Sequence, residues 1–220
     1  MARLARVVIP NVPHYIIQRG NRGQDTFFEP ADYKAYLEIM AEWCDRCRVT
    51  ISAYSLLPNH VHLIATPKTY DGLARAVGEA HRRYTRRIND LYGWSGFLWQ
   101  GRFASFPMDP PTWVKAACYV EQSPVMEGVS RSAKTYRWSS AKAHLKGKDD
   151  ALVKVAPLQK KVGDWAAFLK EGISEEDAAL IEAHSRTGRP LGKPNFVSRL
   201  EDKLDRTLAP QKRGPKPKNR

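Results

Sequence analysis

The sequence predicts a mixed α+β fold, built on a ferredoxin-like (split βαβ) antiparallel sheet to which further helices are added. Two observations predict it. Short segments rich in apolar and β-branched residues alternate with longer segments whose apolar residues recur every three to four positions, the spacing of one helix face. In chain order these segments read strand, helix, strand, strand, helix, strand, which is the order of the split βαβ fold.

Turn-forming residues set the limits of these elements, notably a Gly-Asn-Arg-Gly cluster at 20–23 and Pro58-Asn59. Strands are expected at 7–19, 49–57, 60–66 and 97–108. The helices between them, at about 30–48 and 72–91, have buried faces made by residues three or four apart. These are Tyr33, Tyr36, Leu37, Met40, Cys44 and Cys47 in the first, and Leu73, Val77, Ala80, Tyr84, Ile88 and Leu91 in the second.

A third helix is expected over 110–122, because proline is favoured in a first turn and Ser123-Pro124 should end the helix. Periodicity is weaker beyond residue 130. There we expect a short helix beginning at 136–140 and others at 164–170, 175–184 and 195–208. We divide the chain into residues 1–145 with the sheet and third helix, a helical, basic C-terminal extension at 146–209, and a disordered basic tail at 210–220.

The chain is strongly basic, with a formal net charge of +13 and a pI near 9.8. From residue 186 onward, 11 Lys and Arg outnumber 3 Asp and Glu. This charge favours a polyanionic partner, most simply nucleic acid, and the six Trp and nine Tyr provide rings on which bases can stack.

Several classes of protein are disfavoured. No run of 18 apolar residues and no signal-peptide apolar region occur, so we expect a cytoplasmic protein with no membrane partner. Three cysteines are an odd number, so no complete disulfide framework fits. Cys44 and Cys47 form a Cys-x-x-Cys pair without a second pair at zinc spacing, and we interpret them as buried hydrophobic residues.

Two histidines mark the third expected strand, where His60 and His62 flank Val61 in an apolar segment. Side chains two residues apart in a strand share a face, so both imidazoles can reach one metal ion while Val61 points into a core. Two imidazoles on an apolar strand are costly to bury unless something ligates or hydrogen-bonds them. The spacing is therefore typical of a metal or phosphate site, or of two structurally satisfied histidines.

A divalent ion held there could polarise a phosphodiester and would leave positions for a third protein ligand and for substrate oxygens. Mg²⁺ prefers oxygen ligands, whereas Mn²⁺ accepts imidazole more readily. The third helix offers one nucleophile, Tyr119, with Lys115 one turn earlier as a cation that could assist its ionisation. A tyrosine on a packed helix is usually a half-buried core residue, so spacing alone favours that interpretation over a catalytic role.

The second expected helix has an arginine-rich face opposite its apolar face. Its members are Arg75, Arg82, Arg83, Arg86 and Arg87. Such a face is often only solvated, but we interpret this one as lacking the acids that usually intersperse a solvated face. We therefore predict that it follows a nucleic-acid phosphate backbone.

Four motifs then occur in order: PHYIIQRGNR at 13–22, LPNHVHL at 57–63, LWQGRF at 98–103 and YVEQSPV at 119–125. Together they resemble the REP-associated tyrosine transposases, relatives of the single-tyrosine insertion-sequence (IS200-like) transposases in the HUH nuclease superfamily. The resemblance covers residues 6–138 and extends loosely into TGRPLG at 187–192.

The resemblance implies that residues 1–145 form a catalytic domain. His60 and His62 would bind the divalent metal, Mg²⁺ or Mn²⁺, with no small-molecule cofactor. Tyr119 would attack single-stranded DNA, giving a 5′-phosphotyrosine link and a free 3′-hydroxyl that can reverse the step. Four residues after the tyrosine the family has Asn or Gln as a further ligand, where this chain has Ser123. The third ligand would then be Ser123, acting through water, or Gln122 or Glu121. Met126 stands where the family has Arg.

The family's substrates are REP hairpins, short palindromes with a specific tetranucleotide at the foot. By this resemblance the partner is single-stranded hairpin DNA. The residues we expect to contact it are Arg19, Arg82, Arg83, Arg86, Arg87, Arg102 and Lys115, and the 195–208 helix is a candidate for a DNA groove.

Two alternatives of other classes stay open at this stage. The Ser123 departure favours a DNA-binding or regulatory protein on the same fold with weak or no catalysis. An RNA-binding ferredoxin-like domain is disfavoured, because it needs aromatic residues where this chain has imidazoles. Insertion-sequence relatives exchange the tyrosine helix between two subunits, whereas the REP-associated branch works as a monomer, so a monomer is favoured over a dimer.

Overall fold

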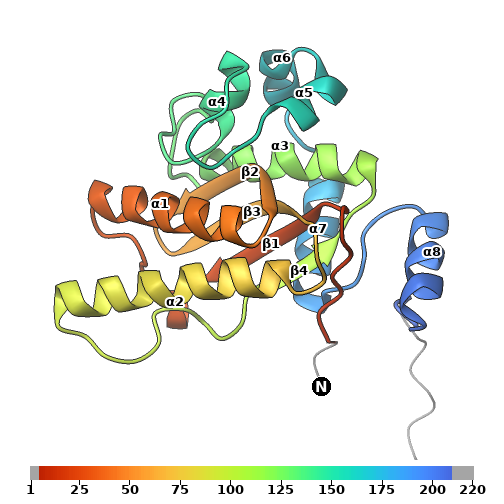
Figure 1. Cartoon of the computed structure of the whole chain (residues 1–220). Helices are drawn as coiled ribbons and strands as arrows, with labels where there is room; N and C mark the ends of the chain where they lie inside the picture. The colour runs from red at the N-terminus through yellow and green to blue at the C-terminus, as the bar shows by residue number, and fades with distance from the viewer. Residues whose placement is uncertain (1–4, 210–220) are drawn as a thin grey trace, which may run out of the picture.

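Four antiparallel strands form one sheet in the order β2-β3-β1-β4 (Figure 1). The strands are β1 (His14–Arg19), β2 (Val49–Leu57), β3 (His60–Pro67) and β4 (Ala104–Pro107). The computed structural model describes residues 5–209. Its strand order and its element order confirm the ferredoxin-like α+β prediction.

Helices cover both faces of the sheet, because each strand alternates apolar residues to both sides. Ile16 of β1 packs with α1 (Pro30–Arg46) and α2 (Gly72–Tyr92), whereas its neighbours Tyr15 and Ile17 pack with α3 (Pro110–Met126). The helix faces expected from the 3-to-4 spacing are largely buried, and both Cys44 and Cys47 lie in the core as free cysteines. In Figure 1, α2 lies below the sheet and α3 above it.

The tyrosine-bearing helix α3 is longer than expected, because Pro124 lies inside it rather than after its end. A proline has no N–H to donate to the carbonyl four residues earlier, which here is that of Val120. The hydroxyl of Ser123 donates to this carbonyl instead, at 2.8 Å. The helix can therefore continue for about one turn beyond the expected end, to Met126.

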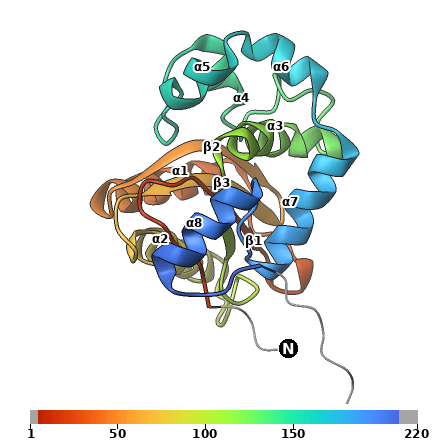
Figure 2. The same ribbon diagram turned by 90° about the vertical axis from the view of Figure 1, so that its right-hand side faces the viewer.

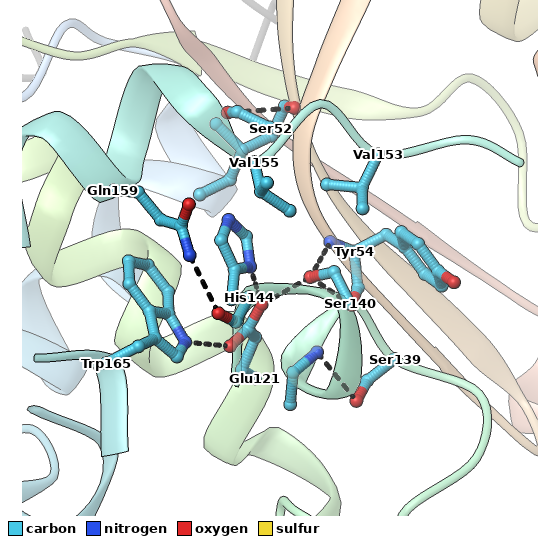
Figure 3. Close-up of polar contacts among 12 residues, drawn as sticks. Ser52, Tyr54, Glu121, Ser139, Ser140, His144, Val153, Val155, Gln159 and Trp165 are labelled. Carbon is cyan, nitrogen blue, oxygen red and sulfur yellow. Dashed lines mark hydrogen bonds and ion pairs between the residues drawn. The ribbon is translucent and has the colours of Figure 1, made fainter. Parts of the chain in front are cut away.

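Three short helices, α4 (Ala141–Lys146), α5 (Ala156–Val162) and α6 (Trp165–Glu171), pack on the outer side of α3 (Figures 1 and 2). Buried Glu121 of α3 anchors α4 and α6 to α3. It accepts hydrogen bonds from Ser140 Oγ at 2.5 Å, His144 Nδ1 at 2.6 Å and Trp165 Nε1 at 2.8 Å (Figure 3). Since a buried carboxylate without partners is costly, these three donors stabilise Glu121 and hold α3 from the side away from the sheet.

The chain ends with α7 (Glu175–Thr187), which contacts β4, β1 and α3, and with α8 (Pro194–Leu204). The buried face of α8 packs Phe196 and Leu200 against Val7 and Ile9 of the N-terminal segment. Residues 210–220, expected as a disordered tail, lie outside the described residues. The domain division at 145/146 stays a prediction, since α5, α6 and α7 share a core cluster with α3.

Several expected boundaries were wrong. Residues 98–103 form an irregular segment and not the expected strand, because Gly101 takes a left-handed φ of 63°. In this segment only Trp99 forms a β-bridge, to Gly20, the residue after β1. β1 begins at His14, after a turn with Asn11 at φ 63°. α4 starts at Ala141, α5 was not expected, and α8 ends at Leu204 instead of continuing to 208. Within residues 5–209, no helix has the length and apolar character to cross a bilayer.

Candidate functional site

The two histidines of β3 face α3 as a pair. His60 and His62 are 6% and 1% exposed, and their Nε2 atoms lie 3.0 Å apart. Val61 between them is buried in the core on the opposite face, with α1 and α2. This confirms the shared face predicted from their spacing.

The other nitrogen of each imidazole is already engaged. His60 Nδ1 is 2.7 Å from Asn59 Oδ1, and His62 Nδ1 is 2.7 Å from the Tyr15 hydroxyl. Such partners fix the ring orientation of metal-ligating histidines. They leave both Nε2 atoms aimed at one point.

A carboxylate completes the cluster. Oε1 of Glu127, the residue that ends α3, lies 3.1 Å from His60 Nε2 and 3.9 Å from His62 Nε2. The ligand atoms of His60, His62 and Glu127 lie within 4.8 Å of one another, and no other group of three His, Cys, Asp or Glu residues in the described chain meets that test. Two imidazoles and a carboxylate form a donor set that suits Mn²⁺ better than Mg²⁺.

Tyr119 lies on the same face of α3, two turns before Glu127. Its ring centroid is 5.7 Å from that of His62, and its hydroxyl donates to Oε1 of Glu182 on α7, at 3.5 Å. Tyr119, Ser123 and Glu127 follow one another at four-residue spacing, so one helix face carries them all toward the histidine pair.

Burial and acidic neighbours control ionisation here. Burial raises the pKa of Tyr119 to about 12, Glu182 and Glu127 add to this effect, and Arg19 opposes it. Burial lowers the pKa of His62 to about 4, which keeps its imidazole neutral near pH 7. Burial alone would raise the pKa of Glu127, but hydrogen bonds from His60 and His62 bring it to about 2.

These groups open into a single cavity of about 400 Å³. Its walls include the metal-ligand candidates, Tyr119 and Glu182, and also Arg19 at the end of β1. Arg19 pairs with His60 in the sheet register, which places a cation beside the histidines. The candidate nucleophile Tyr119, the candidate cation-binding cluster and the positive charge of Arg19 therefore share one opening.

Residues 13–123, just over half of the chain, match the family model described as "Transposase IS200 like". The chain belongs to the IS200-like transposase family. The resemblance noted from the sequence motifs is thereby confirmed at the level of the family. No curated protein sequence matches the chain.

One solved structure agrees with the fold of this IS200-like transposase, and two others are similar over a smaller part of it. The REP-associated tyrosine transposase bound to a REP hairpin superposes with a TM-score of 0.59 at 17% identity, over 69% of this chain and 90% of that one. A putative transposase from Deinococcus radiodurans R1 gives 0.38 at 21% identity, over 55% and 97% of the two chains. A bacterial tRNA(His) guanylyltransferase-like protein bound to GTP gives 0.36 at 11% identity, over 56% and 71%.

Of the three residues expected as a third ligand, only Ser123 lines the cavity. Its hydroxyl is donated to Val120. Gln122 points the other way and donates to the Leu169 carbonyl, and Glu121 belongs to the buried cluster of Figure 3. Glu127 was missed because Pro124 was interpreted as the end of the helix.

Of the cationic residues expected to contact DNA, only Arg19 lines the cavity. Lys115 pairs with Asp177 at 2.8 Å and does not face the Tyr119 hydroxyl. Arg102 lines a smaller groove with Arg6 and Arg186 at the β4 edge of the sheet.

The arginine face of α2 lies on the other side of the sheet from Tyr119. It does contain acids, contrary to expectation. Arg82 pairs with Glu79 at 2.6 Å, and Arg86 lies 3.6 Å from Asp90. Arg83 stacks over the Trp43 ring at 4.9 Å, while Arg87 is partly buried. If this face binds DNA, as we propose below, it contacts a part of the DNA that lies outside the cavity.

Proposed function

We propose that this IS200-like transposase is a metal-dependent endonuclease and strand transferase that acts on single-stranded, REP-type hairpin DNA through Tyr119. One observation carries the proposal: the Tyr119 hydroxyl and the cluster of His60, His62 and Glu127 line the same cavity. A scissile phosphate in that cavity can meet both at once.

In the proposed step the Tyr119 oxygen attacks phosphorus and forms a new phosphate ester, while the bond from phosphorus to the 3′-oxygen breaks. The products are a 5′-phosphotyrosine and a free 3′-hydroxyl. Because one ester replaces another, a 3′-hydroxyl can reverse the step and join strands without a nucleotide cofactor. A divalent ion bound by His60, His62 and Glu127 would neutralise charge on the phosphate and polarise it.

The choice of substrate rests on two supports. The solved relative with the same fold is described as bound to a REP hairpin. This chain also carries a net charge of +13, which suits a nucleic-acid backbone. In this proposal Arg19 binds phosphate beside the cavity, and the arginines of α2 together with Arg102 and Lys115 bind the rest of the hairpin.

All residues of the candidate site come from one chain, which supports a monomer. The Tyr119 and His62 rings are 5.7 Å apart in the same chain, so no second subunit is needed to bring the tyrosine to the histidines. A dimer that exchanges α3 is the alternative, and light scattering separates the two. The cytoplasmic location and the lack of a small-molecule cofactor stay predictions.

One observation favours the second candidate function, a DNA-binding or regulatory protein with weak or no catalysis. The Tyr119 hydroxyl is hydrogen-bonded to a carboxylate, and burial and acidic neighbours disfavour its ionised form. A protein whose nucleophile is restrained in this way would bind hairpin DNA but cleave it only slowly.

The deciding experiment incubates the full chain with a labelled hairpin oligonucleotide in Mn²⁺, in Mg²⁺ and in EDTA. We expect a covalent adduct that needs metal and is absent in Tyr119→Phe. The matched control is Tyr70→Phe, since Tyr70 is 54% exposed and lies before α2, away from the cavity. Binding without an adduct under every condition would establish the second function instead, and cleavage of duplex DNA would contradict single-strand specificity.

A further inference from the structure

Four large aromatic side chains are exposed around the end of α2 and the start of α1. Phe28, Tyr92, Trp94 and Phe97 are 41%, 36%, 47% and 87% exposed, and we call them the aromatic patch. Three of these rings contact one another. The centroid distances are 4.9 Å for Phe28–Tyr92, 5.4 Å for Phe28–Trp94 and 5.1 Å for the stacked pair Tyr92–Trp94. Exposed clusters of rings are uncommon on a protein that has no partner for them.

The loop after α2, which carries Trp94 and Phe97 of the patch, is held in shape by its own hydrogen bonds. Trp94 N donates to the Asn89 carbonyl at 2.8 Å, and Asn89 Nδ2 donates to the Gly96 carbonyl at 3.1 Å. Gly93 and Gly96 supply the left-handed φ values, 66° and 93°, that the loop requires. Trp94 and Phe97 are therefore presented by a loop that is already ordered. The stacking of a ligand on them costs little conformational entropy in the loop.

The patch lies at the same end of the sheet as the cavity. Thr26 and Phe27 donate backbone hydrogen bonds to the Pro58 carbonyl, at 2.7 and 3.1 Å, and the segment from Pro58 leads directly into Asn59 and His60. On the other flank, Asn21 N donates to the Leu98 carbonyl at 2.8 Å. The start of α1 and the end of α2 lie together at the left of Figure 1.

The segment that carries Tyr92, Trp94 and Phe97 is rich in arginine, and Arg87, Glu29 and Asp32 are the charged groups that act on Tyr92. Residues 82–102 contain five arginines and one acid, Asp90. Three acids lie on the Phe28 side, of which Glu29 and Asp32 form a reciprocal capping box at the start of α1 and Asp25 is exposed. Aromatic rings among arginines suit single-stranded nucleic acid, because bases stack on the rings while phosphates meet the cations. An apolar protein segment would not need the arginines.

We propose that the aromatic patch is a stacking platform for unpaired DNA bases that flank the hairpin. This inference rests on the proposed function for the identity of the DNA. It adds a second contact region, outside the cavity, which holds the single strand as it leaves the scissile phosphate. Its ligand is the base face, so it contributes affinity with little sequence preference.

The test measures binding without cutting, in the full chain carrying Tyr119→Phe. One hairpin has a single-stranded extension with a 2-aminopurine, and a second hairpin is blunt. We expect Trp94→Ala/Phe97→Ala to bind the extended hairpin about 10-fold more weakly, about 1.4 kcal/mol, and to lose the quenching of 2-aminopurine. Blunt-hairpin affinity should not change. Tyr70→Ala, which removes an exposed ring elsewhere, is the matched control.

Equal affinity of the double variant and its parent for the extended hairpin would overturn the proposal. An equal loss for the blunt hairpin would also overturn it, since the patch would then contact the duplex. Loss of a dimer in light scattering, with DNA affinity unchanged, would assign the patch to a second copy of this chain.

An unstructured single strand with 2-aminopurine separates this proposal from the proposed function. Quenching that depends on Trp94, in a protein that forms no covalent adduct, would support the platform while the catalytic proposal fails. An adduct without such quenching would leave catalysis standing and overturn the platform.

Discussion

The Tyr119 hydroxyl donates a hydrogen bond to Glu182 Oε1 at 3.5 Å, which joins the middle of α3 to α7. The other carboxylate oxygen of Glu182 lies 3.6 Å from Arg186, so α7 itself holds the carboxylate in place. The proposed nucleophile is thus restrained by a helix that follows it by more than 50 residues. Its reactivity should depend on α7 as well as on the metal cluster.

Glu182→Gln should accelerate adduct formation several-fold at pH 8. The negative charge of Glu182 adds to burial in raising the pKa of Tyr119, so its removal lowers that pKa and also removes a charge that repels phosphate. Initial rates in Mn²⁺ between pH 7 and pH 10 measure the change. Glu176→Gln, on an exposed position of α7, is the control. A slower reaction would instead assign Glu182 as the acceptor of the Tyr119 proton.

The sequence allowed the fold and the histidine pair to be predicted, because both depend on local periodicity. Alternation in 60–62 is enough to place His60 and His62 on one face, and the order of strands and helices follows from similar patterns. The side of the sheet on which a helix packs is not a local property. The arginines of α2 were correctly expected on an exposed face, but their position opposite Tyr119 could not be inferred.

Glu127 and Glu182 were missed for two different reasons. Glu127 continues the four-residue spacing from Tyr119 through Ser123, so the sequence does contain a signal for it. The signal was missed because Pro124 was expected to end the helix before Glu127. The hydrogen bond from the Ser123 hydroxyl to the Val120 carbonyl, which is visible only in the structure, explains why the helix continues past Pro124. Glu182 reaches the site through tertiary packing of α7, for which spacing carries no signal.

Glu127→Gln should weaken Mn²⁺ binding at least tenfold. The amide keeps the shape of the side chain but loses the charge that makes the carboxylate a good ligand for a divalent ion. Isothermal titration of the protein without DNA measures this directly. Equal affinity in Glu127→Gln and the wild type would remove Glu127 from the ligand set.

Ser123→Ala should leave Mn²⁺ affinity unchanged but destabilise the protein by about 1–2 kcal/mol. The Val120 carbonyl would lose its hydrogen-bond donor, and Pro124 cannot replace it. Urea unfolding compares the two proteins, and titration with Mn²⁺ compares their affinities. Loss of metal affinity with unchanged stability would restore Ser123 as a ligand, as the family motif suggested.

Stability should fall on acidification from about pH 6.5 toward pH 4. Burial lowers the pKa of His14 to about 4, against an opposing hydrogen bond to the Val12 carbonyl, and burial lowers that of His81 to about 3. The unfolded chain therefore binds these protons first, and each histidine costs about 2 kcal/mol of stability between pH 7 and pH 5. Urea unfolding in EDTA at the two pH values measures this without a contribution from bound metal.

His81→Gln tests the assignment, because glutamine can keep a hydrogen bond with the Tyr36 hydroxyl, 3.0 Å from His81 Nε2, and does not titrate. The difference in stability between pH 7 and pH 5 should shrink by about 2 kcal/mol in this variant. An unchanged difference would mean that His81 is protonated in the folded protein at pH 5. The stacked Trp99 ring, 4.6 Å from His81, would then stabilise the imidazolium as a cation–π partner.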